Sequence, residues 1–252
     1  MIVIPMAGLS SRFKKAGFTL PKYMLEAHGK TLFYHSLMSF NSYFETQSFL
    51  FIALEVSNTK NFIEKECEKL GIKNFEIVIL DAPTRGQAES VSLGLNSANV
   101  EPNEPILIFN IDTFRPGYKF PTDFDFNQSH GYLETFIGSG ENWSNIAPAS
   151  TCKKTVRYTA EKKEISEFCC TGLYYFAKAQ LFVEAFQEYS KLDLENVDAR
   201  EYYIAPMYNF LINQGLTINY SVIPRDEVIF CGVPDEFYAF LKSKYDSDKD
   251  YW

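Results

Sequence analysis

Short apolar runs alternate with amphipathic segments along the first 115 residues. Four runs have the length and composition of buried strands, at residues 2–6, 48–56, 75–80 and 105–112. Between them, apolar positions recur at helical spacing in residues 31–43, 58–71 and 86–98, and the second of these helices has Asn58 as a candidate N-cap and Gly71 as its end. This alternation predicts a Rossmann-like α/β fold, in which a mixed, mostly parallel sheet is flanked by helices.

The rhythm changes after Asp112. Strand-like runs at residues 131–138, 155–159 and 169–176 are separated by turn-rich segments, and the predicted elements that follow are helices 179–189 and 203–213, a strand at 216–223 and a helix at 234–245. We expect the tail 246–252 to be frayed. Neither a repeat nor a linker interrupts the chain, so we predict one domain over residues 1–252, with two halves that meet near residue 115.

Composition narrows the class of protein. A formal net charge of −8 argues against nucleic-acid or anionic-membrane partners, and no apolar run is long enough to span a bilayer. The absence of a basic segment before the first strand argues against a signal peptide. Five cysteines without CxxC spacing predict reduced thiols in a cytoplasmic protein, and three scattered histidines favour neither a His-based metal site nor a Ser-His-Asp triad.

A basic segment stands out against this acidic background. Residues 4–25 contain Arg12, Lys14, Lys15 and Lys22 but no acid, and small residues directly precede Arg12. A loop of small residues at the carboxyl end of a strand lets backbone N–H groups approach phosphate oxygens, which the cations neutralise. A solvated surface loop is the alternative. Neither GxxxxGK[ST] nor GxGxxG is present.

Four stretches, in order, resemble the sugar-phosphate nucleotidyltransferase family. They are "MAGLSSRF…PKYML" near the start, "TRGQAESV" (84–91), "LIFNIDTF" (107–114) and "TAEKKEIS…CCTGLYYF" (159–176). The resemblance implies a GT-A-like fold and a nucleotidyltransferase of the EC 2.7.7 type. In such an enzyme an acceptor phosphate attacks the α-phosphorus of a nucleoside triphosphate, and pyrophosphate leaves.

The resemblance also implies roles for individual residues. About 1–115 becomes the nucleotide-binding half and about 116–252 the acceptor-binding half. Arg12 and Lys22 would be catalytic, and Asp112 would bind Mg²⁺ as cofactor, unless it is simply a turn aspartate after a strand. The expected nucleotide-binding residues are Ala7, Gly8, Leu9, Ser10, Ser11, Gly86 and Gln87, with Gly86 and Gln87 facing the base or, alternatively, only starting a helix.

Two departures from the family pattern affect this site. Ser10 stands where the family has a second loop glycine, which restricts the backbone but adds a hydroxyl. Phe230 stands where the family has a second metal-binding aspartate, so Asp226 becomes the candidate second metal ligand.

The acceptor side is implied by the Glu161-Lys162 pair, with the adjacent Lys163 as an alternative for contact with the acceptor phosphate. The stretches "GSGENWSN" (138–145) and "REYYIAPMYN" (200–209) resemble the subgroup of CTP:phosphoglutamine cytidylyltransferases that serve capsular phosphoramidate synthesis. This resemblance implies that CTP and L-glutamine phosphate give CDP-L-glutamine and pyrophosphate. Four further residues then become acceptor-binding candidates: Arg200, Glu201, Trp143 and Ser144.

Three alternatives remain open at this point. The acceptor is a sugar 1-phosphate in the first, and the chain is a glycosyltransferase in the second, although Asn110-Ile111-Asp112 lacks the first acid of a D-x-D pair. The third is a non-catalytic nucleotide sensor, which the missing aspartate at Phe230 favours. Aromatic residues in the second half also suggest a homodimer.

Overall fold

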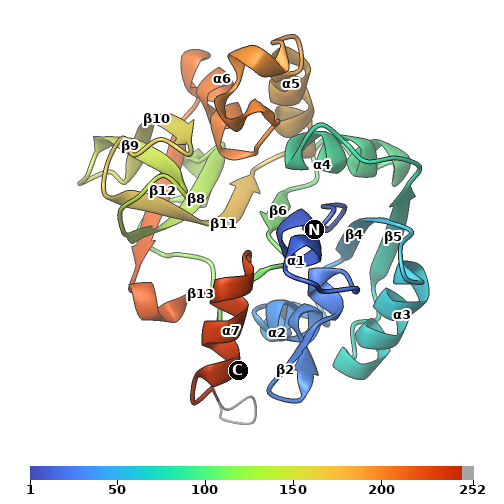
Figure 1. The fold of residues 1–252 in the computed structure, drawn as a ribbon. Helices are drawn as coiled ribbons and strands as arrows, with labels where there is room; N and C mark the ends of the chain where they lie inside the picture. Colours follow the sequence, from blue (N-terminus) through green and yellow to red (C-terminus); the bar gives the residue numbers. More distant parts are fainter. Residues whose placement is uncertain (246–252) are drawn as a thin grey trace.

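The computed structural model describes residues 1–245, and its centre is a nine-stranded mixed sheet (Figure 1). The strand order is β5-β4-β1-β6-β11-β8-β12-β10-β9. These strands are β1 (Ile2–Pro5), β4 (Phe49–Leu54), β5 (Phe75–Leu80), β6 (Ile106–Phe109), β8 (Gly131–Ile137), β9 (Ser144–Ser150), β10 (Thr155–Glu161), β11 (Phe168–Phe176) and β12 (Ile218–Ile223).

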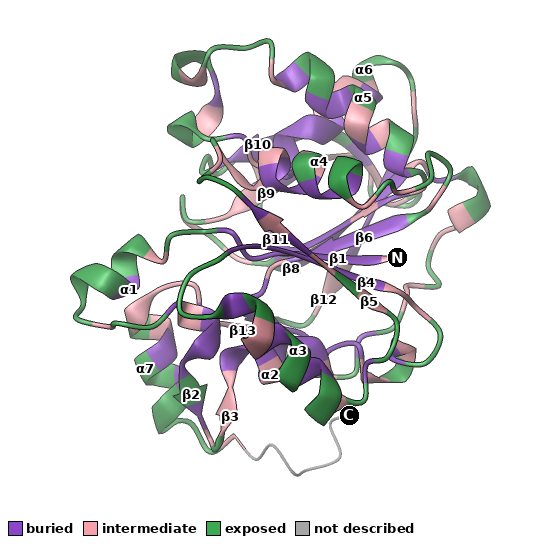
Figure 2. Cartoon of the chain, turned by 90° about the vertical axis from the view of Figure 1, so that its right-hand side faces the viewer, coloured by how far each residue is buried: buried purple, intermediate pink, exposed green. Residues whose placement is uncertain are grey.

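Helices cover both faces of this sheet. Figure 2 shows the sheet nearly edge-on, with α4 (Gln87–Ser97), α5 (Ala179–Tyr189) and α6 (Tyr208–Asn213) above it and α2 (Leu32–Met38), α3 (Thr59–Leu70) and α7 (Pro234–Lys242) below. The predicted α/β fold with a flanked mixed sheet is confirmed. None of the helices described in residues 1–245 is long and apolar enough to cross a membrane.

The continuous apolar runs of the sequence reflect strands that are buried on both faces. In β4, Leu50 and Ile52 belong to the core under α4–α6, whereas Phe49 and Phe51 belong to the core under α2 and α3. Successive side chains of a strand point to opposite faces, so both faces of β4 must be apolar. The parallel order of β5, β4, β1 and β6 brings their carboxyl ends to one edge of the sheet.

The later strands turn the sheet back on itself. β11 runs antiparallel to β6 on one side and to β8 on the other. From β8 the pairing continues through β12 and β10 to β9, and β9 then pairs with β11 at Asn145 and Cys169. The second half of the chain therefore contains a closed ring of five strands beside the open parallel part.

Several elements were not predicted, among them β9, α1 and the short strands described below, and α2, α6 and α7 are shorter than the expected helices. β9 contains Pro148 and few β-branched residues, and α1 (Ser11–Lys15) buries only Phe13, so neither has a clear periodic pattern. The expected helix 203–213 is a 3₁₀ turn (Ala205–Met207) followed by α6, with Pro206 inside the turn. The predicted frayed tail, 246–252, lies outside the described residues.

Two small ladders complete the description of the strands. β2 (Glu26–Ala27) pairs with β3 (Lys30–Thr31), and β7 (Thr113–Phe114) pairs antiparallel with β13 (Ile229–Phe230). The β7–β13 ladder matters for function because it joins the residues after Asp112 to those before Gly232.

Candidate functional site

A cavity of about 720 Å³ opens at the carboxyl ends of β1 and β6, between the two halves of the chain. With the exception of Asp226, every predicted site residue lines it: Ala7, Gly8, Leu9, Ser10, Ser11, Arg12, Lys22, Gly86, Gln87, Asp112, Trp143, Ser144, Glu161, Lys162, Arg200 and Glu201. Ligands of open α/β sheets bind at this edge, so the fold and the sequence indicate the same place.

The loop after β1 forms one wall of the cavity. Ser10 has a left-handed backbone (φ 51°), a conformation that glycine adopts more easily, and its Oγ accepts a hydrogen bond from the backbone N–H of Lys22 at 3.2 Å. Ser10 thus fixes the position of Lys22 relative to the loop. Arg12 is exposed, and its side chain makes no hydrogen bond or ion pair with residues 1–245.

Lys22 and Asp112 form an ion pair in this cavity. The Nζ of Lys22 lies 2.5 Å from Oδ2 of Asp112, and both side chains are about one-fifth exposed, at 21% and 19%. The carbonyl of Asp112 accepts a hydrogen bond from the N–H of Cys231 at 2.8 Å, and a β-carbon at Gly232 would lie 3.0 Å from Oδ2. The carboxylate is therefore held between the lysine and a residue that has no side chain to obstruct it.

The second predicted metal ligand is not brought to this carboxylate. Asp226 is exposed in the 3₁₀ turn Arg225–Glu227 and does not line the cavity. Phe230 does line it, but packs against Trp143 at a ring-centroid distance of 4.5 Å. The prediction for Asp226 does not agree with its position, because the β7–β13 ladder directs Phe230 to the site and leaves the turn before it outside.

The donor set suits one hard divalent cation. Within residues 1–245 no cluster of three or more His, Cys, Asp or Glu side chains could hold a metal ion. Asp112 can supply one carboxylate, and Mg²⁺ commonly takes its other ligands from substrate phosphates and water. Asp112 and the oxygens of a bound triphosphate therefore fit such an ion, whereas a fully protein-made cage does not.

Glu236 is a cavity residue that sequence reasoning missed. Its carboxylate accepts hydrogen bonds from the N–H groups of Gly232 (2.8 Å) and Val233 (3.2 Å) at the start of α7. Burial raises its pKa, the nearby charge of Asp112 raises it further, and Arg12 opposes both effects. Glu236 lies three residues after Val233 and accepts from its N–H, as the glutamate of a capping box does, although Val233 has no side-chain acceptor to complete the motif.

Gly86 and Gln87 begin α4, where the sequence predicted contact with the base. Both residues line the cavity. The backbone of Tyr202 packs directly against Gly86 (φ 147°), so that a β-carbon on Gly86 would lie 2.5 Å from the backbone nitrogen of Tyr202. The missing side chain therefore accommodates the segment that carries Arg200 and Glu201. Gln87 donates from Nε2 to Oδ1 of Asn110 at 2.6 Å.

The acceptor-side candidates lie together across the cavity from the β1 loop. Glu161 is buried and accepts a hydrogen bond from the hydroxyl of Ser144. Burial raises the pKa of Glu161 to about 7, with contributions from the charges of Asp198 and Glu201, while the Ser144 hydroxyl and Lys162 lower it. A carboxyl group of this kind changes its charge within the physiological pH range.

The side chains of the adjacent residues Lys162 and Lys163 lie in different places. Lys162 (φ 51°) points into the cavity and donates from Nζ to the hydroxyl of Tyr203 at 2.6 Å. Lys163 lies outside the cavity and forms an ion pair with Asp198. The structure therefore favours Lys162 over Lys163 as the residue that meets an acceptor.

Arg200 and Glu201 lie at the same side. Arg200 and its neighbour Ala199 both have left-handed backbones (φ 55° and 56°), which are strained for these residue types. The side chains of Arg200 and Glu201 have no ion-pair or hydrogen-bond partner within the described part of the chain. Two opposite charges are thus left free at the cavity wall.

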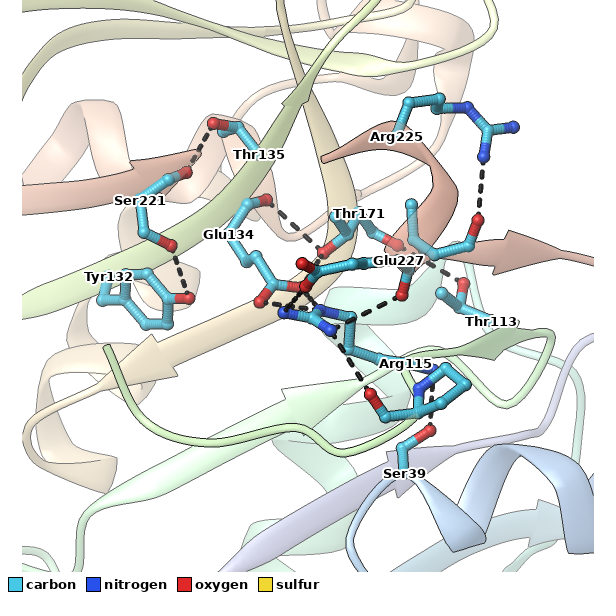
Figure 3. A network of polar contacts seen from close by, with 12 residues as sticks. Ser39, Thr113, Arg115, Tyr132, Glu134, Thr135, Thr171, Ser221, Arg225 and Glu227 are labelled. Atoms are coloured by element: carbon cyan, nitrogen blue, oxygen red, sulfur yellow. Dashed lines mark hydrogen bonds and ion pairs between the residues drawn. The ribbon is translucent and has the colours of Figure 1, made fainter. Parts of the chain in front are cut away.

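A buried ion-pair network lies behind the cavity (Figure 3). Nε of Arg115 lies 3.1 and 3.2 Å from the two oxygens of Glu134, and its Nη2 lies 3.0 Å from Glu227. Thr171 donates to Glu134 at 3.2 Å. Burial raises the pKa of Glu134, and the charge of Arg115 opposes this. Because Arg115 follows β7 and Glu227 lies shortly before β13, the network holds together the two-stranded ladder that Asp112 directly precedes.

The charge of the cavity differs from that of the whole chain. Its lining includes five cationic side chains (Arg12, Lys22, Arg85, Lys162 and Arg200) and four acidic ones (Asp112, Glu161, Glu201 and Glu236), in a chain of net charge −8. Cations therefore concentrate where anionic ligands would sit.

No protein-family model matches the sequence, and no curated protein matches it. A crystal structure described as the nucleoside-diphosphate-sugar pyrophosphorylase from Vibrio cholerae RC9 is 51% identical and has a TM-score of 0.90, covering 96% of this chain and 100% of the other.

Two more distant structures share the fold. The inositol-1-phosphate CTP transferase from T. maritima is 14% identical with a TM-score of 0.71, covering 95% of this chain and 94% of its own. A putative glucose-1-phosphate thymidylyltransferase from Bacillus anthracis is 13% identical with a TM-score of 0.69, covering 97% and 96%. The near-complete match at 51% identity shows that this chain belongs to the nucleoside-diphosphate-sugar pyrophosphorylase family and is a nucleotidyltransferase.

Proposed function

We propose that this enzyme transfers a nucleoside monophosphate from a nucleoside triphosphate to a sugar 1-phosphate and releases pyrophosphate. The observation that supports this most is the Lys22–Asp112 pair, which lines a cavity whose walls come from both halves. In this proposal residues of about 1–115 hold the nucleotide and residues of about 116–252 hold the acceptor. The acceptor class rests on the 51% identical pyrophosphorylase.

The reaction needs two anions in contact and little covalent chemistry from the protein. An oxygen of the acceptor phosphate forms a bond to the α-phosphorus while the bond from that phosphorus to the β-phosphate oxygen breaks. We assign Arg12 to the leaving pyrophosphate and Lys22 to the α-phosphate, because both are cations of the nucleotide wall. Asp112 would hold Mg²⁺, which would supply positive charge to the phosphates.

The acceptor would then bind opposite the nucleotide. The ammonium of Lys162 has three N–H donors and uses one of them for the hydroxyl of Tyr203. It can therefore donate another hydrogen bond to the acceptor phosphate. Glu161 and the Ser144 hydroxyl offer acceptors and donors to sugar hydroxyl groups. Trp143 presents an aromatic surface beside them.

A second candidate is transfer of CMP from CTP to L-glutamine phosphate, as in capsular phosphoramidate synthesis. It is favoured by Arg200 and Glu201, whose unpartnered opposite charges could match the carboxylate and ammonium of an amino acid. A sugar 1-phosphate carries neither group, so the two candidates require different partners at the same wall.

The test is release of pyrophosphate in the presence of Mg²⁺, with CTP, UTP, dTTP, ATP and GTP each paired with several sugar 1-phosphates and with L-glutamine phosphate. Release with one sugar 1-phosphate supports the first proposal, and release only with CTP and L-glutamine phosphate supports the second. Lys162→Ala should lower the rate with the true acceptor, whereas Lys163→Ala, next to it but outside the cavity, is the matched control. Nucleotide binding without turnover in every pair would contradict both and indicate a sensor.

A further inference from the structure

Asn110, which directly follows β6, is fixed in place by four hydrogen bonds. Its backbone N–H donates to the carbonyl of Gly172 at 3.1 Å, and its carbonyl accepts from the N–H of Thr113 at 3.1 Å and from the hydroxyl of Ser36 at 3.4 Å. Its side-chain Oδ1 accepts from Nε2 of Gln87 at 2.6 Å. Both the backbone and the orientation of the carboxamide are therefore determined by the protein.

The other end of this carboxamide is unused. Nδ2 of Asn110 has no hydrogen-bond partner in residues 1–245, and it is not among the described side-chain atoms that are sealed from solvent without a partner. Asn110 lines the cavity. A residue of the cavity wall thus carries an amide nitrogen with two N–H donors and no protein acceptor, beside Gly172.

The space that the carboxamide of Asn110 occupies is available because residue 172 is a glycine. Gly172 has a backbone φ of +97°, and a β-carbon there would lie 2.4 Å from Nδ2 and 2.8 Å from Cγ of Asn110. Any side chain at residue 172 would therefore displace the carboxamide. The glycine of the "CCTGLYYF" stretch is explained by this contact between β11 and the residue after β6.

The position of Asn110 indicates which part of a nucleotide it meets. On one side it is bonded to Gln87, which we assign to the base, and two residues further along the chain is Asp112, which we assign to the phosphates. The ribose lies between the base and the phosphates of any nucleotide. A donor between these two contacts is therefore placed to reach the sugar.

We propose that Asn110 donates a hydrogen bond from Nδ2 to one of the two ribose hydroxyls, and that it makes this enzyme selective for nucleotides that carry this hydroxyl. The inference rests on the proposed nucleotide site and is independent of which acceptor is used. Gln87 is a positioning residue here, because its bond to Oδ1 directs Nδ2 toward the ligand.

The test is equilibrium binding, measured calorimetrically with Mg²⁺, of CTP, 2′-deoxy-CTP and 3′-deoxy-CTP, repeated with the corresponding uridine nucleotides. Loss of one hydrogen bond to a fixed donor corresponds to about a tenfold difference in affinity. We expect the unaltered protein to bind the ribonucleotide about tenfold more tightly than one of the deoxy analogues. Equal affinities for all three would overturn the proposal without any variant.

Asn110→Ala should remove this preference by weakening CTP and the analogue that keeps the contacted hydroxyl, while the analogue that lacks this hydroxyl binds as before. Gln87→Ala should reduce the preference less. Asn213→Asp, an exposed change at the end of α6, serves as the control, with thermal unfolding to show that each variant is folded. Equal weakening of all three nucleotides by Asn110→Ala, or a preference that survives it, would contradict the ribose contact. If the protein binds nucleotides but does not turn them over, the proposed function is contradicted, and the binding data still test the Asn110–ribose contact. If the protein binds no nucleotide, both the proposed function and the ribose contact are overturned.

Discussion

The ammonium of Lys22 lies 2.5 Å from the carboxylate of Asp112, although 90 residues separate them in the chain. The cation that we assign to the α-phosphate therefore neutralises the carboxylate that we assign to Mg²⁺ as long as neither ligand is bound. Both ligands need this pair to separate, so their binding should be coupled through it.

The first prediction concerns this coupling. Lys22→Ala should increase the affinity of the nucleotide-free protein for Mn²⁺, because Asp112 loses its competing cation, and Asp112→Asn should abolish the binding. Electron paramagnetic resonance titration of free Mn²⁺ measures both. An unchanged Mn²⁺ affinity in Lys22→Ala would show that the ion pair does not compete with the metal.

The second prediction separates binding from turnover at Lys22. Lys22→Ala should lower kcat by about 100-fold or more and weaken triphosphate binding by less than about tenfold, because the charge on the α-phosphate develops most in the transition state. Lys14→Ala is the matched control, since Lys14 is exposed on α1 and does not line the cavity. Equal losses in kcat and in affinity would argue against this role.

The third prediction distinguishes two glycines of the cavity. Gly86→Ala should destabilise the fold by about 2–3 kcal/mol, because the new β-carbon meets the backbone of Tyr202. Gly8→Ala should preserve stability, since no atom lies within 4 Å of a β-carbon there, and should instead weaken triphosphate binding. Chemical denaturation and calorimetry together test the pair, and a stable Gly86→Ala variant would contradict the packing argument.

The fourth prediction concerns the buried network. Arg115→Leu should cost about 3–5 kcal/mol of unfolding free energy, because it leaves Glu134 charged and without its main partner in the core. The double variant Arg115→Leu/Glu134→Leu should recover much of that loss. A thermodynamic double-mutant cycle from denaturant unfolding measures the coupling, and strictly additive losses would show that the pair is not coupled.

The fifth prediction follows from the raised pKa of Glu161. A folded-state pKa of about 7, above the ordinary value of 4.5, means that the stability linked to its protonated form is fully present below about pH 4.5 and is lost as the pH rises through 7. Glu161→Gln should therefore stabilise the protein by about 1–3 kcal/mol at pH 8 and by little at pH 4.5. Unfolding at both values tests this, and a benefit that does not change with pH would rule out the titration.

Local pattern predicted the regular elements well. The limits of α5 (Ala179–Tyr189) and β5 (Phe75–Leu80) agree with the sequence expectation, because the apolar residues of α5 repeat with helical period and those of β5 form a short continuous run, as in a buried strand. β9 was missed because its pairing with β10 and β11 is made by backbone groups, and Pro148 and Asn145 give its sequence no strand-like pattern.

The site was accessible to sequence reasoning mainly through resemblance. Arg12, Lys22 and Asp112 lie in recognisable motifs that assign them a role. Asn110 and Tyr203 lie in stretches that resemble the family but were assigned no role, because their place in the cavity depends on long-range contacts. The absence of the family's second aspartate was visible in the sequence, but the placement of Asp226 outside the cavity depends on the pairing of β7 with β13.

β11 is hydrogen-bonded to β6 along one edge and to β8 along the other, and it carries the glycine that accommodates Asn110. The two halves of the chain that we assign to the nucleotide and to the acceptor therefore share one sheet. Replacing one half with that of a relative would disturb the pairing of β6 with β11. A chimaera joined near residue 115 would pair β6 of one parent with β11 of the other, and would have to match Asn110 to Gly172 across that seam. Exchange of acceptor specificity between relatives is thus confined to the segments that β11 does not carry, such as 138–163 and 194–203.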